Sequence, residues 1–141
     1  METHRNGLEL LDRDECLRLL RDSTIGRIGI SSAALPVVVP VSYALSGDTI
    51  VLRTARDSRL AAATTNAVVA FEVDDLDRSG DGWTVLVTGI ADEVTDPDEW
   101  ACCRELLPGP WEPGSDGRFV RISTDLVSGQ RTAAPCRAAT A

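Results

Sequence analysis

The chain contains no lysine: all 14 of its basic residues are arginines. Schiff-base chemistry on a lysine, including a pyridoxal phosphate aldimine, is therefore excluded. Histidine is almost absent as well, because His4 near the N-terminus is the only one. A catalytic triad cannot be assembled around that residue. If the protein carries out chemistry, we expect a bound cofactor to supply the reactive group.

Cysteine is also scarce, and its spacing fits neither a metal site nor a disulfide framework. The four cysteines are Cys16, Cys102, Cys103 and Cys136. None of them forms a C-x-x-C pair, and no histidine lies nearby to complete a zinc site. Free thiols and no bound metal are the expectation. Walker and dinucleotide-type glycine motifs are absent too.

Size and charge narrow the class of protein further. A chain of 141 residues with 43% apolar residues predicts one domain whose core needs no metal or disulfide. A net charge of -8 argues against a protein that coats nucleic acid. No signal peptide or long apolar run is present, so we expect a soluble, cytoplasmic protein without a membrane partner.

Hydrophobic periodicity predicts a mainly β protein with a few short helices. Asp12 is a good N-cap for an amphipathic helix that ends near Asp22. Further helices are expected at 58–65 and from Asp96 to just before Pro108. Strands are expected at 25–31, 36–45, 49–54, 67–74, 83–94 and 118–124. Short strands at this spacing favour an antiparallel barrel or sheet.

The remaining segments were expected to lie outside the strands. Residues 1–11 read as a lead-in, 12–131 as a single domain, and 132–141 as a disordered tail. Residues 125–131 read as a structured tail after the last strand. Asp74 and Asp75 read as solvated loop charges.

The junction from Arg53 to Arg59 is the strongest candidate binding site. A strand ends in Arg53-Thr54, and a helix opens with Ser58-Arg59 four residues later. Free N–H groups at a helix start and bidentate guanidinium groups both favour a bound phosphate. The alternative, equally supported by the local residues, is a strand end with solvated arginines and Ser58 as a plain N-cap.

Three further segments carry weaker signals. Trp83 and Thr84 open the longest strand, where a tryptophan either shields a planar cofactor or covers a barrel end. The strand 36–45 contains Pro40, which implies an edge, a bulge or a kink, and leaves backbone groups free for a ligand. Gln130 and Arg131 follow the last strand, where a solvated tail is the default interpretation.

The order of these motifs resembles a known family. A proline-containing strand ends in Tyr43, and after a hairpin the next strand ends R-T-x-x-x-S-R. An A-F-E-V-D strand and a G-W-x-V-x-V-x-G strand follow. Together they are similar to the pyridoxamine 5′-phosphate oxidase-like family over roughly residues 12–131. The resemblance implies an antiparallel FMN-binding split β-barrel with a few short peripheral helices. It also implies a homodimer that holds FMN at its interface.

The resemblance also implies a role for each motif. The FMN phosphate would be held at the strand end and helix start, by Arg53, Thr54, Ser58 and Arg59. The flavin ring would run along the proline-containing strand, at Pro40, Val41, Ser42 and Tyr43. The partner subunit would contribute Trp83 and Thr84, and a C-terminal segment near the cofactor would contribute Gln130 and Arg131.

Two departures separate this chain from the true oxidases. Leu60 stands where they carry a second basic residue, and their Arg-Leu-x-Pro-like ending with a nearby His is missing. The resemblance therefore implies an FMN-dependent oxidoreductase that transfers a hydride to a small, unidentified substrate. The alternatives are a deazaflavin-dependent reductase, with Arg27 or Arg56 extending a basic groove, and a non-enzymatic flavin carrier or sensor. No catalytic side chain is assigned.

Overall fold

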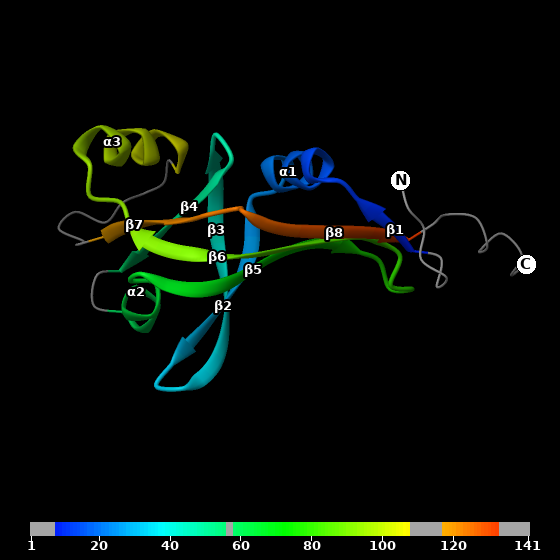
Figure 1. Ribbon diagram of the computed structural model, residues 1–141, viewed down its shortest axis with the longest axis horizontal. Helices are drawn as coiled ribbons and strands as arrows, with labels where there is room; N and C mark the ends of the chain where they lie inside the picture. Colours follow the sequence, from blue (N-terminus) through cyan, green and yellow to red (C-terminus); the bar gives the residue numbers. More distant parts are fainter. Residues whose placement is uncertain (1–7, 56–57, 108–116, 133–141) are drawn as a thin grey trace, which may run out of the picture.

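Strands dominate the protein, and a computed structural model describes residues 8–55, 58–107 and 117–132 (Figure 1). The helices in this part of the chain are α1 (Arg13–Asp22), α2 (Arg59–Ala63) and α3 (Pro97–Leu106). The strands are β1 (Leu8–Leu11), β2 (Ile25–Ser32), β3 (Leu35–Ser46), β4 (Thr49–Ala55), β5 (Ala67–Leu76), β6 (Gly82–Glu93), β7 (Gly117–Ile122) and β8 (Leu126–Thr132).

The sheet closes into a six-stranded antiparallel barrel with an extension. Its strand order is β1-β8-β6-β5-β2-β3-β4-β7, and β6 also pairs with β7, which closes strands β2 to β7 into a ring. β6 divides its length between two neighbours: residues 83–88 pair with β8, and residues 91–93 pair with β7. Figure 1 shows β8 and β1 continuing to the right, away from α2 and α3. The split-barrel prediction is confirmed.

One face of each barrel strand fills the core, because side chains alternate along a strand. The Phe71 ring is fully buried and packs edge-on against Tyr43 at a centroid distance of 4.9 Å. Where β2 lies against this ring it has a glycine, because a Cβ at Gly26 would lie 2.4 Å from Phe71. α1 adds its apolar side, including Leu17 and Leu20, to the same core.

Capping side chains fix the starts of the helices. Asp12 accepts a hydrogen bond from the Glu15 amide at 2.9 Å, and Asp96 accepts one from the Glu99 amide at 3.0 Å. The helix starting at Asp12 and the helix starting at Asp96 are thus confirmed. In the described part of the chain, no helix is long and apolar enough to cross a membrane.

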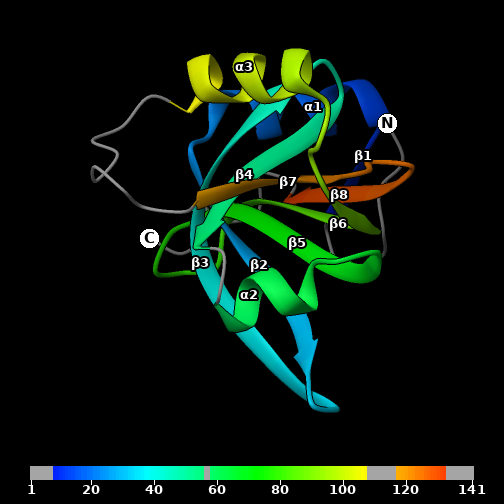
Figure 2. The ribbon, with the colours of Figure 1, turned by 90° about the vertical axis from the view of Figure 1, so that its left-hand side faces the viewer.

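α3 covers the outside of only one part of the barrel. Figure 2 shows it above β4 and β7, where a second small core forms from Val51, Val94, Cys103 and Phe119. The outward side chains of β8, β6, β5, β2 and the first part of β3 remain accessible to solvent. We call this surface the open face. Its exposed apolar side chains are Ile25, Val38, Val68, Leu86, Ile90 and Leu126.

Two segments that were expected outside the sheet belong to it. Residues 126–132 form β8 and residues 8–11 form β1, and the two strands pair with each other. Thr132, assigned to the tail, therefore ends a strand, while 133–141 lie outside the described residues.

The end of β5 and the position of Pro40 in β3 can both be compared with the sequence predictions. Asp74 belongs to a strand, as the prediction for 67–74 has it, and Asp75 is also a strand residue rather than a loop charge, because β5 stays paired with β6 up to Leu76 opposite Gly82. Pro40 lies in the part of β3 that pairs only with β2, so the expected edge position is confirmed.

Candidate functional site

The junction between β4 and α2 presents a buried, unpaired hydroxyl beside an exposed arginine. Thr54 is 5% exposed, and its hydroxyl has no hydrogen-bond partner among the described residues. The Ser58 hydroxyl accepts from the Ala61 amide at 3.0 Å and donates to the Ala55 carbonyl at 2.8 Å, so it is the N-cap of α2. Arg59, the first residue of α2, is exposed.

The side chains of Arg53 and Leu60, also considered at this junction, do not lie with Thr54. Arg53 and Thr54 project to opposite sides of β4, and the Arg53 guanidinium lies over Gly117, where a Cβ would be 2.2 Å from its Nε. Leu60 packs against the barrel core, which explains why an apolar residue replaces the basic one. Arg56 lies outside the described residues.

Arg118 is a central residue of this barrel end that sequence reasoning did not identify. It pairs across the strands with Thr54 and is only 8% exposed. Its Nη2 donates to the Ala61 carbonyl at 2.7 Å and to the Thr65 hydroxyl at 3.1 Å, and Nη1 contacts Glu93 at 3.2 Å. Its Nε, like the Thr54 hydroxyl, has no partner in the described part of the chain. Thr54 Oγ1 and Arg118 Nε are thus two buried polar atoms without a hydrogen-bond partner at the same end of the barrel.

In the segment of β3 expected along the flavin ring, only some of the side chains are accessible to a ligand. Pro40 and Ser42 are exposed on the open face, and Val41 is turned toward the core. Tyr43 is buried, and its hydroxyl donates to the Leu20 carbonyl at the end of α1. Burial raises the pKa of Tyr43 to about 12. The Tyr43 hydroxyl is therefore not available to a ligand, and the Tyr43 amide already donates to the Thr24 carbonyl at 3.0 Å.

The register of β6 and β8 brings the other four candidate residues together. Trp83 lies opposite Arg131, and Thr84 lies opposite Gln130. Arg131 forms an ion pair with Glu15 of α1 at 3.1 Å. Hydrogen bonds from Arg18 and Arg131 lower the pKa of Glu15 to about 2. The expected solvated tail is thus a strand that anchors α1.

The phosphate junction and the β6–β8 residues lie near opposite ends of strand β6. The pair Thr54–Arg118 lies beyond the last residue of β6, because Val120 is already opposite Glu93. Trp83 and Thr84 lie at the other end of β6, a strand of 12 residues. An extended strand of this length rises roughly 36 Å from end to end, so the two groups of candidate residues are well separated along β6.

A charged cluster on the open face connects β3 to β6 and β8. Arg27 is opposite Pro40 on one side and Glu72 on the other, while Asp74 is opposite Thr84. The Arg27 Nη1 atom lies 3.4 Å from Glu72 Oε1 and 3.3 Å from Asp74 Oδ2. Burial and the nearby Asp74 raise the pKa of Glu72 to about 7, against the opposite effect of Arg27.

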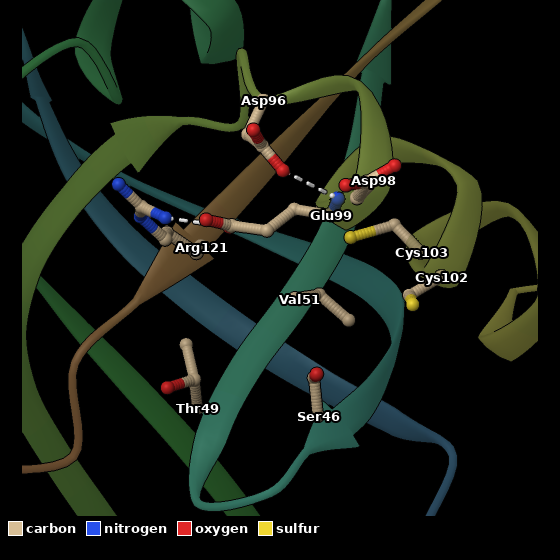
Figure 3. Close-up of a pocket in the computed structure, with 9 residues that line it drawn as sticks. All are labelled: Ser46, Thr49, Val51, Asp96, Asp98, Glu99, Cys102, Cys103 and Arg121. Carbon is tan, nitrogen blue, oxygen red and sulfur yellow. Dashed lines mark hydrogen bonds and ion pairs between the residues drawn. The ribbon is translucent and has the colours of Figure 1, made fainter.

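A cavity of about 440 Å³ lies elsewhere, between α3 and the β3–β4 hairpin (Figure 3). None of the candidate cofactor residues lines it. Among its polar groups, Glu99 pairs with Arg121 at 2.6 Å and Asp96 caps α3. Cys102 and Cys103 line it as free thiols, as expected. The described residues contain no group of three side chains able to hold a metal ion.

A closed six-stranded barrel extended by β8 and β1 is the architecture of the flavin-binding split-barrel proteins. The family model for pyridoxamine 5′-phosphate oxidase matches residues 12–131, and the chain belongs to this family. The Mycobacterium tuberculosis protein Rv0080 is 38% identical over 133 residues, which cover 90% of this chain and 87% of that protein.

Solved structures with a closely similar fold include two FAD-binding proteins. The one from Mycobacterium smegmatis is 29% identical, with a TM-score of 0.75, and the match covers 86% of this chain and 98% of that chain. The one from Mesorhizobium loti is 25% identical, with a TM-score of 0.73, and the match covers 87% of this chain and 96% of that chain.

Proposed function

We propose that the protein is a homodimeric flavin-dependent oxidoreductase that binds FMN between its two copies. The observation that carries this proposal is the β4–α2 junction, where Arg59 and the unpaired Thr54 hydroxyl are available in a chain of a flavin-binding family. The separation of the candidate residues along β6 supports the dimer, because a second copy can supply the missing half of each site.

Different residues of the chain would bind different parts of the flavin cofactor. Arg59 provides a charged fork for the phosphate, and the Thr54 hydroxyl is a second donor, while Ser58, which donates to the Ala55 carbonyl, fixes the start of α2. The exposed edge of β3 around Pro40 and Ser42 provides unpaired backbone groups for the polar rim of the ring. From the other copy, Thr84 and Gln130 project from the open face. The bound flavin would supply hydride transfer to a small substrate.

The phosphate contact can be tested by binding of FMN to the purified protein. Replacing Arg59 with alanine should weaken binding by about 1.5–3 kcal/mol, the scale of a hydrogen bond to a charged group. This corresponds to an increase in Kd of roughly 10- to 150-fold. Arg104→Ala removes an exposed arginine from the last turn of α3 and is the matched control. Flavin fluorescence quenching measures both, and an unchanged Kd for Arg59→Ala would overturn the proposal.

FAD is a second candidate, because two similar structures belong to FAD-binding proteins. Competition between FMN, FAD and a deazaflavin cofactor on the same protein distinguishes the three. Anaerobic addition of NAD(P)H then separates an oxidoreductase from a carrier. Bleaching of bound flavin supports hydride chemistry, whereas bound flavin that no nicotinamide reduces favours the carrier or sensor function.

A further inference from the structure

We propose that Glu72 and Asp74, held by Arg27, take up one proton when a second copy covers the open face. Formation of the homodimer is then linked to pH. This inference rests on the homodimer of the proposed function, and it gives the carboxyl pair a role in controlling that assembly. No covalent step is involved: one carboxylate oxygen of the pair gains a proton from solvent.

The geometry leaves the cluster one charge short of neutrality. Two carboxylates share a single guanidinium group at 3.3–3.4 Å, which gives the cluster a net charge of -1 when both are ionised. The Glu72 and Asp74 side chains retain exposures of 33% and 26%, so water still stabilises part of that charge. Covering the face removes this water, and desolvation disfavours the charged form.

The neighbouring strands supply no second positive charge, and an identical open face brings only another copy of the same cluster. From β6, Thr84 and Leu86 face the pair, and from β3 Pro40 lies beside Arg27. Arg27 is thus the only charged group that the described neighbouring strands direct at the two carboxyls. A two-fold dimer places the same set of residues on both sides of the interface. Each copy therefore brings its own excess negative charge, which protonation removes.

The sign of the effect follows from the pKa of Glu72, about 7 in the free chain. Below that value the pair already holds its proton, so dimerisation takes up little and its Kd is nearly constant. Above it the free chain has lost the proton and the dimer must regain it. The dimer dissociation constant should then rise at least about tenfold between pH 7 and pH 8.5, toward a limit of two protons per dimer.

The experiment is analytical ultracentrifugation of the full chain without added cofactor, from pH 5.5 to 9. Wild type should show a constant Kd up to pH 6.5 and weaker association above pH 7. Glu72→Gln mimics the protonated carboxyl, so its dimer should stay tight up to pH 9. Asp74→Asn should behave in the same way, and it replaces Glu72→Gln in the test if that variant folds poorly. Asp98→Asn removes an exposed carboxylate from α3, away from the open face, and should keep the wild-type pH dependence.

The outcomes separate this inference from the proposed function. A wild-type dimer whose Kd does not change with pH, or a pH dependence that persists in both neutral variants, overturns the proton linkage and leaves the dimer standing. A chain that is monomeric at every pH overturns the dimer, and the linkage with it. Loss of the pH dependence in the two open-face variants, with its retention in Asp98→Asn, supports the proposal.

Discussion

A single missing methyl group at Gly26 sets the packing of the barrel core. A Cβ there would lie 2.4 Å from the buried Phe71 ring, which Tyr43 holds from the other side. Gly26→Ala must displace that ring, and we expect a loss of about 1–3 kcal/mol in the free energy of unfolding. Gly29→Ala on the same strand is the control, because its Cβ meets Ala70 at an ordinary 3.5 Å. Urea denaturation compares them, and equal stabilities would contradict this account.

Arg118 binds α2 to the barrel. Its removal should therefore lower the free energy of unfolding far more than removal of a surface arginine. Arg118→Met leaves Glu93 without its ion pair and frees the Ala61 carbonyl. We expect a loss of at least about 3 kcal/mol in the free energy of unfolding. Arg121→Met, on the same strand, removes an exposed pair with Glu99 and should cost under about 1 kcal/mol. Denaturant unfolding checks both, and similar losses would mean that Arg118 acts only as a surface residue.

Some roles of individual residues could be predicted from the local sequence. Others could be recognised only from the register of the paired strands. The caps at Asp12, Ser58 and Asp96 follow from residue type and spacing, and all three form as expected. Glu72 lies 45 residues from Arg27 in sequence, so their contact depends on which strands are neighbours. The meeting of Thr54 with Arg118 depends on the β4–β7 pairing in the same way.

At the level of elements, α1 is attached to β8 by a carboxylate that acid should neutralise. Arg18 and Arg131 lower the pKa of Glu15 from 4.5 to about 2. The folded state therefore binds fewer protons than the unfolded chain between these two values. The stabilisation from Glu15 is complete above pH 4.5 and is lost as the pH falls toward 2.

Thermal unfolding from pH 6 to pH 2.5 measures this contribution. Glu15→Gln should lower Tm at pH 6, and the difference from wild type should shrink as the pH falls. Glu105→Gln changes an exposed carboxylate on α3 and should leave the profile close to that of wild type. A constant Tm difference between Glu15→Gln and wild type across this range would show that the ion pair does not stabilise the docking of α1.

The sequence revealed neither β1 nor β8 as strands, and for β8 Gly129 explains why. The stretch from Leu126 to Arg131 shows little alternation of apolar and polar residues, because a glycine occupies an inward position. A Cβ at Gly129 would lie 2.6 Å from the Cys16 sulfur on α1. The requirement for glycine thus comes from a helix more than 100 residues earlier in the chain, and only the fold reveals it.

For the molecule as a whole, the strand pattern and the order of motifs were sufficient to predict a split barrel. The open face was not predictable, since it depends on where α3 packs. Five strands present their outward residues there, and Val68 and Ile90 face each other across β5 and β6 at 67% and 50% exposure. Pro40, Ser42, Thr84 and Gln130 lie on the same face. This continuity is the structural reason to expect that a second copy and the cofactor use one surface.

The open face predicts the behaviour of a charged substitution at its centre. Val68→Asp changes a solvent-exposed side chain, so the isolated chain should fold normally. In a dimer formed through this face, each copy would bury an added carboxylate in the interface, which disfavours association. We expect a monomer by light scattering at micromolar concentration, with an unchanged circular dichroism spectrum. Its affinity for FMN should fall with the dimer, because Thr84 and Gln130 of the second copy are then missing from each site.

Leu106→Asp is the control for a charge placed on an exposed apolar residue. Leu106 is 40% exposed at the end of α3, away from the open face, so this variant should remain dimeric and bind FMN as wild type does. If Val68→Asp is dimeric, the two copies meet through another surface. If it is monomeric and retains the wild-type affinity for FMN, a single chain holds the whole cofactor site, and the candidate residues on β6 and β8 take no part in it.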